Sequence, residues 1–140
     1  MRLLWIVCVC ALAGCGGDDG EAALECSRGD RWGTYLLEYS ERSGDCGPLP
    51  DALSRLDDED AMGDGCELDA PDRWSADSCR LERAYTCEDP GIGVTGTFVA
   101  VTEQRDGSGA RLTGLLTVRL RDADGRVLCS GTYDVTATRQ

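Results

Sequence analysis

Three segments in the C-terminal half of the chain constrain the fold most strongly: 95–104, 111–121 and 126–139. Apolar side chains recur at every second position in them, which is the period of a β-strand with one buried face. The separators 106–109 and 122–125 carry the Asp and Gly residues that tight hairpins need at positive φ angles. The pattern predicts an antiparallel meander with one face in water.

Two earlier segments, 32–41 and 79–88, alternate in the same way. The apolar residues that share one face within these segments are Tyr35, Leu37, Tyr39, Leu81 and Tyr85. Arg83 falls on the same face as its neighbours Leu81 and Tyr85, so we expect either a clamp for an anionic ligand or a buried pairing with an acid.

The intervening stretch 47–78 contains three prolines and the acidic run 57–60. Its segment 51–56 (DALSRL) is expected to form a short helix, and the rest is expected to be a long irregular loop, either functional or held by disulfides. The sequence therefore predicts an all-β fold: a small antiparallel meander or an up-and-down barrel, with one short helix in a long loop.

The N-terminus indicates export. Met1 and Arg2 form a short positive start, and residues 3–13 are an uncharged apolar run of eleven residues. At helical rise this run spans about half of a bilayer core of roughly 30 Å, which is too short for a transmembrane helix. The run is typical of the apolar part of a secretory signal.

The apolar run ends with Leu12 and Ala13, and the next two residues are Gly14 and Cys15. Together these residues resemble the lipobox at which bacterial lipoproteins are cut and lipidated. The resemblance implies that the small residues admit the peptidase and that the thiol of Cys15 accepts a diacylglycerol, so that acyl chains anchor the protein to a membrane. The alternative is a soluble secreted protein cut near Ala13, with Cys15 incidental.

This organisation predicts a signal peptide over 1–14, a lipidated cysteine with a flexible acidic tether over 15–25, and one disulfide-rich β domain over 26–140. In enteric-type lipoproteins an Asp directly after the lipidated cysteine retains the protein in the inner membrane. Gly16 stands there in this chain, and the resemblance therefore implies the outer membrane, on its periplasmic or cell-surface side.

Six of the nine cysteines fall within the expected domain: Cys26, Cys46, Cys66, Cys79, Cys87 and Cys129. An even set in an exported chain predicts three disulfides, and fifteen pairings are possible. If 79–87 is a continuous strand, Cys79 and Cys87 lie about 26 Å apart, so each should pair with another cysteine. A metal site is the alternative, but the sequence has no CxxC pair and no histidine.

The composition excludes several functions. The sequence has 14 basic residues, all arginine, 26 acidic residues and no histidine. Catalytic triads based on histidine and Schiff-base lysines are therefore excluded. A net charge of -12 opposes nucleic-acid binding, because it repels phosphates. We expect no cofactor.

A triplet of glycine, threonine and an aromatic residue occurs three times, at 33–35, 96–98 and 131–133. It resembles the Gly-x-Trp opening of lipocalins and the Gly-Thr-Trp and Gly-Thr-Tyr repeats of avidin-type barrels, which close a meander around a small ligand. The alternative is that such triplets are common in β-rich chains and have no bearing on ligand binding.

The acidic residues allow two further chemistries. The acidic region 57–72 offers oxygen ligands for calcium but has no EF-hand spacing, so a solvated acidic surface is the alternative. Two carboxylates at a suitable distance can hydrolyse a glycoside, but among so many acids some pair will meet that distance in any fold.

The sequence predicts a non-enzymatic, membrane-anchored lipoprotein of the bacterial cell envelope, either structural or a module that binds an envelope protein. Such a module should show an exposed aromatic patch, for which Trp32 and Trp74 are the candidates. The alternatives are a small barrel that carries a small apolar ligand and a carboxylate-dependent hydrolase.

Overall fold

The computed structural model describes residues 25–56, 65–105 and 107–140. One short 3-10 helix, η1 (Arg28–Arg31), precedes the strands. The strands are β1 (Gly33–Gly44), β2 (Ala52–Leu56), β3 (Cys66–Leu68), β4 (Arg73–Ser75), β5 (Arg80–Asp89), β6 (Val94–Gln104), β7 (Arg111–Arg121) and β8 (Val127–Arg139). The expected signal peptide 1–14 and nearly all of the tether 15–25 lie outside the described residues, as do Leu12, Ala13, Gly14 and Cys15.

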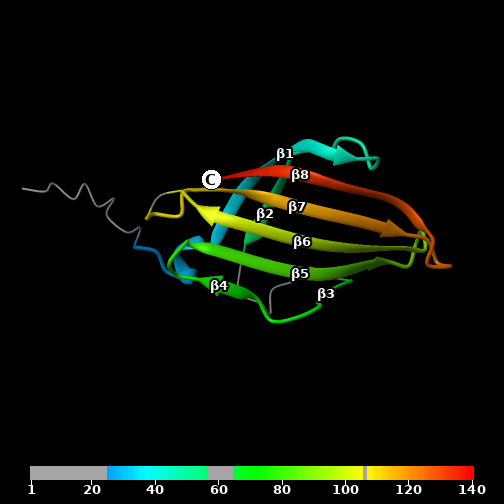
Figure 1. Ribbon diagram of the computed structural model, residues 1–140, viewed down its shortest axis with the longest axis horizontal. Coiled ribbons are helices and arrows are strands. Elements are labelled where there is room, and N and C mark those ends of the chain that lie inside the picture. The colour runs from blue at the N-terminus through cyan, green and yellow to red at the C-terminus, as the bar shows by residue number, and fades with distance from the viewer. Residues whose placement is uncertain (1–24, 57–64, 106) are drawn as a thin grey trace, which may run out of the picture.

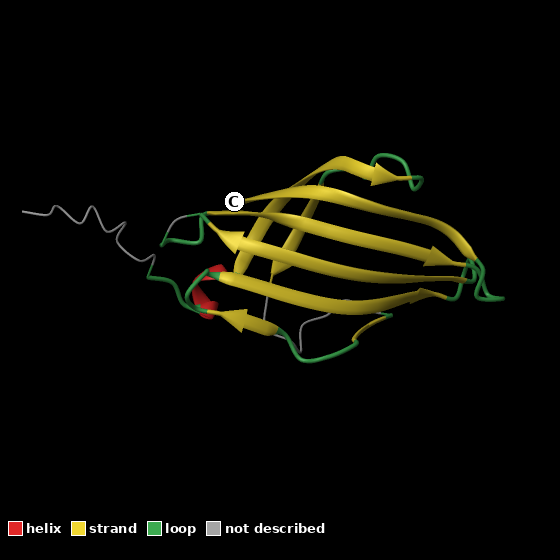
Figure 2. Ribbon diagram, in the orientation of Figure 1, coloured by secondary structure: helices red, strands yellow, loops and turns green. Residues whose placement is uncertain are grey.

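All eight strands belong to one antiparallel sheet in the order β2-β1-β8-β7-β6-β5-β3, with β4 paired to β5 beside β3. The sheet curls into a half-barrel (Figures 1 and 2). Within the described residues no pairing joins β2 to β3 or β4, so the described strands form a half-barrel and not a closed barrel. The all-β, disulfide-stapled, antiparallel domain predicted from the sequence is confirmed.

The predicted meander is β6 to β8, and β5 extends it by one strand; successive strands from β5 to β8 pair along ten or more residues. The core lies on the concave face of these strands. One cluster contains Leu116, Val118, Tyr133 and Val135, and a second contains Tyr35, Leu112 and Ala137. The alternation of apolar residues in the sequence therefore predicted correctly which face of these strands is buried.

The predicted helix over 51–56 is wrong, because Ala52–Leu56 is strand β2. It pairs with β1 in the register Leu36↔Leu53 and Tyr35↔Ser54. A six-residue helix is marginal in isolation, since nucleation outweighs the few hydrogen bonds it gains. Pairing with a long strand supplies hydrogen bonds that the local sequence cannot, and it decides the structure.

The stretch expected to be an irregular loop also holds two three-residue strands. Both pair with β5: β3 in the register Cys66↔Cys87, and β4 in the register Trp74↔Leu81. They form a broken edge to the sheet, beyond which backbone groups have no strand partner among the described residues.

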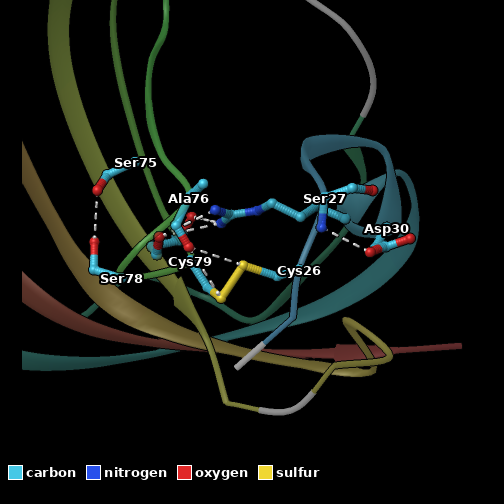
Figure 3. The surroundings of a disulfide bond; sticks show 9 residues. Cys26, Ser27, Asp30, Ser75, Ala76, Ser78 and Cys79 are labelled. Carbon is cyan, nitrogen blue, oxygen red and sulfur yellow. Dashed lines mark hydrogen bonds between the residues drawn. A yellow bond between two sulfur atoms is a disulfide. The ribbon is translucent and has the colours of Figure 1, made fainter. Parts of the chain in front are cut away.

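Six cysteines form three disulfides, as predicted: Cys26–Cys79, Cys46–Cys129 and Cys66–Cys87. Cys79 and Cys87 pair with other cysteines, which also agrees with the distance argument. Cys26 joins the residues before η1 to the turn before β5, as Figure 3 shows. The other two bonds lie toward the opposite end, where Cys46 follows β1 and Cys66 begins β3.

At two of its three positions the recurring triplet has a physical explanation. Phe98 and Tyr133 point inward, and each ring leans back over the glycine two residues before it. A Cβ added to Gly96 would come 2.6 Å from the Phe98 ring, and one added to Gly131 would come 3.0 Å from the Tyr133 hydroxyl. The glycine therefore makes room for an inward aromatic ring.

Among the described residues, no helix has the length and hydrophobicity needed to cross a bilayer.

Candidate functional site

The concave face of the half-barrel contains a cavity of about 260 Å³. Its walls come from every strand except β4. The lining residues are Leu37, Tyr39, Ser54, Arg55, Leu56, Cys66, Arg83, Tyr85, Ala100, Thr102, Leu116, Val135 and Ala137. Most of these contribute aliphatic or aromatic carbon, with hydroxyls and two guanidinium groups at a few points. Such a lining is typical of a site for a small organic molecule.

Two tyrosines, Tyr39 and Tyr85, line the cavity, and Phe98 supports the ring of Tyr85 from outside the lining. Tyr85 and Phe98 are cross-strand partners, and their rings stack with centroids 5.0 Å apart and planes 13° apart. Tyr39 faces the cavity from β1 on the other side. Burial raises the pKa of both phenols, and for Tyr85 the nearby Tyr39 adds to the increase while Arg83 opposes it. Both hydroxyls are therefore protonated at neutral pH.

The sequence left two possibilities for Arg83, a clamp for an anionic ligand or a buried pairing with an acid. The structure shows the pairing. Arg83 Nε lies 2.9 Å from Asp72 Oδ1 and its Nη2 lies 2.7 Å from Asp72 Oδ2. Arg28 Nη2 reaches the same Oδ2 at 2.8 Å. The Asp72 side chain has no exposed surface, so two arginines hold a fully covered carboxylate beside the cavity.

A second buried arginine lies at the end of the barrel nearest to η1. Arg31 is 1% exposed, and its guanidinium donates to the carbonyl and hydroxyl oxygens of Thr102. It also stacks over the Trp74 ring at 5.4 Å. Burial lowers its pKa to about 10, with smaller effects from neighbouring groups. The sequence did not reveal this residue, because nothing in RGDR distinguishes a covered arginine from an exposed one.

Trp32 and Trp74 were the candidates for an exposed docking patch. Both are only partly exposed, and each ring is covered on one side by an arginine: Arg28 lies over Trp32 at 5.6 Å, and Arg31 lies over Trp74. Exposed apolar side chains occur instead at the opposite end of the sheet, where Ile92 is 72% exposed and Leu128 is 53% exposed.

A larger hollow of about 520 Å³ lies on the convex face. Its rim carries charged groups, and those with described interactions are bound to neighbours: Arg42 Nη2 lies 2.6 Å from Asp134 Oδ1, and Arg105 donates to the Thr113 hydroxyl. An open hollow on the outside of a sheet cannot shield a ligand from water. We therefore regard the concave cavity as the candidate site.

The catalytic and metal alternatives gain no support from this cavity. None of the described residues that line it is Asp or Glu. No group of three potential metal ligands comes together in the parts of the chain that the structure describes. The calcium hypothesis concerned region 57–72, of which 57–64 lies outside the described residues.

Comparison with known proteins finds no matching protein family, curated protein or solved structure.

Proposed function

We propose that this protein is an exported, lipid-anchored, non-enzymatic module that binds a small apolar molecule in the concave cavity of its half-barrel. The observation that carries the proposal is the cavity of about 260 Å³ with its largely apolar lining. A dry engineered cavity of about 150 Å³ binds benzene, and pockets for drug-sized ligands begin near 300 Å³. This cavity therefore suits a molecule of one or two rings, or a short acyl chain.

The placement of the chain ends supports anchoring. The described chain begins at the same end of the half-barrel at which β8 ends (Figure 1). A tether from Cys15 to Cys26 reaches at most roughly 40 Å and would hold the domain by this end. Three disulfides in one small domain are typical of an oxidising, exported compartment.

Anchoring is testable by replacing Cys15 with Ser behind a secretory signal that an ordinary signal peptidase removes. We expect this unlipidated chain to appear in the soluble envelope fraction, whereas the native chain sediments with membranes, because the anchor is its acyl chains. Fractionation and immunoblotting measure both. If the unlipidated chain sediments like the native one, the lipobox interpretation is wrong.

Binding is testable by filling the cavity. Ala100 lines it from β6, and Ala84 is on the convex side of the neighbouring β5. We expect the unlipidated chain to bind 2-ethylnaphthalene in calorimetric titration. Ala100→Leu should weaken binding at least about tenfold, because added carbon takes the ligand's place, while Ala84→Leu should not. Absence of binding to the parent chain, or equal loss in both variants, would contradict the proposal.

Docking of an envelope protein is the second candidate, and the end of the sheet away from the tether favours it. Ile92, Val127 and Leu128 are all more than half exposed there, and such apolar side chains are typical of interfaces. The corresponding test is crosslinked capture from envelope extract. A protein captured equally well by the parent chain and by Ile92→Ser would exclude this surface.

A further inference from the structure

All four tyrosines of the chain lie on the concave face, but they divide into two pairs. The two outer tyrosines are fully buried and satisfied by loop carbonyls. The Tyr35 hydroxyl donates to Gly109 O at 2.6 Å, and the Tyr133 hydroxyl donates to Gly47 O at 2.7 Å. Their hydroxyls therefore fasten loops to the ends of the half-barrel.

The two inner tyrosines differ. Tyr39 and Tyr85 are partly buried and line the cavity. Neither hydroxyl has a hydrogen-bond partner among the described residues, in contrast to those of Tyr35 and Tyr133. Neither hydroxyl is among the covered polar atoms that lack a partner, so both remain in contact with the solvent of the cavity and are free to donate. A ligand that enters the cavity displaces this water, and the lost hydrogen bonds lower its affinity unless the ligand itself carries an acceptor.

We propose that the ligand carries an oxygen acceptor, such as the carbonyl of a ketone, ester or quinone, which receives hydrogen bonds from the Tyr39 and Tyr85 hydroxyls. Its body is flat and apolar and lies against the ring of Tyr85, which is backed by the stacked ring of Phe98. This inference rests on the proposed function, since it names the chemistry of the molecule that the cavity binds.

The charges around the cavity favour an uncharged ligand. Both phenols are protonated at neutral pH, so they act as neutral donors. Two guanidinium groups line the cavity, those of Arg55 and Arg83, and both already have partners. Arg83 is held by the carboxylate of Asp72 through two hydrogen bonds. An anionic head would have to compete with that covered carboxylate, whereas a neutral carbonyl does not.

The test compares two probes of nearly the same shape, 2-acetylnaphthalene and 2-ethylnaphthalene, in calorimetric titrations of the unlipidated chain. Only the first has a carbonyl oxygen. We expect it to bind more tightly, by about 2- to 13-fold for each hydroxyl engaged, which corresponds to a net hydrogen bond of about 0.5–1.5 kcal/mol. Tyr39→Phe and Tyr85→Phe should each reduce this preference, the ratio of the two affinities, by that factor.

Tyr133→Phe is the matched control, because its hydroxyl is bound to Gly47 outside the cavity lining. We expect it to lower stability but to keep the preference for the acetyl probe. If the parent chain binds both probes equally, or if the preference survives in Tyr39→Phe and Tyr85→Phe, the acceptor inference is overturned while the cavity remains a binding site. If neither probe binds, the proposed function itself fails.

Discussion

Replacing Asp72 with Asn should lower the free energy of unfolding by about 3 kcal/mol. The Asp72 side chain is fully covered and accepts hydrogen bonds from both Arg83 and Arg28. Asn has no charge, and only one of its two terminal atoms can accept. The substitution therefore leaves the guanidinium group of Arg83, which is only 14% exposed, without this carboxylate in a site of low dielectric. Urea unfolding followed by circular dichroism measures the change.

Asp134→Asn is the control for this experiment. It breaks the Arg42–Asp134 pair, whose N–O distance of 2.6 Å is similar but whose side chains are 56% and 50% exposed. We expect a loss below about 1 kcal/mol, because water screens an exposed pair. Equal losses in the two variants would mean that burial of Asp72 adds nothing to the energy of its ion pairs.

Removing the Cys46–Cys129 disulfide, by changing both residues to Ala, should lower the free energy of unfolding by about 4–5 kcal/mol. This bond joins residues separated by 83 positions and ties the end of β1 to β8. The unfolded chain gains the most freedom when the longest loop is released. A loss of this size is a large part of the stability of a small domain.

The Cys66–Cys87 bond provides the comparison, since it spans 21 positions. Its removal should cost about 1 kcal/mol less on the same argument. Chemical unfolding of the two double variants under oxidising conditions measures both values. If removal of Cys66–Cys87 proves the more damaging, loop entropy is not the main contribution of these bonds.

The long strands could be predicted because two independent signals agreed. Segment 95–104 alternates and ends at an Asp-Gly turn, and the structure places β6 at Val94–Gln104. A strand of this length buries a whole face, so its pattern is visible locally. The number of disulfides followed from an even cysteine count, while their pairing depended on which strands become neighbours.

The short elements could not be predicted for the converse reason. β2, β3 and β4 have three to five residues, and each exists because a long strand pairs with it. A local pattern in DALSRL fits one helical turn as well as a strand. The open edge between β2 and β3 likewise depends on the whole sheet, so the sequence left meander and barrel as alternatives.

The candidate site was partly visible in the sequence. Alternation placed Tyr39, Tyr85 and Arg83 on inward faces, and it predicted an acid as one possible partner for Arg83. It could not select Asp72 from among 26 acidic residues, because that contact forms only when β4 folds back against β5. The anchor at Cys15 stays a prediction from the sequence.

The most direct test of the central claim is the structure of the unlipidated chain crystallised with 2-acetylnaphthalene. We predict that the naphthalene rings occupy the concave cavity against Tyr85 and that the carbonyl oxygen lies within hydrogen-bond distance of the Tyr39 and Tyr85 hydroxyls. A probe bound only on the outer surface, for example beside Ile92, with the cavity filled by the protein's own side chains, would contradict it.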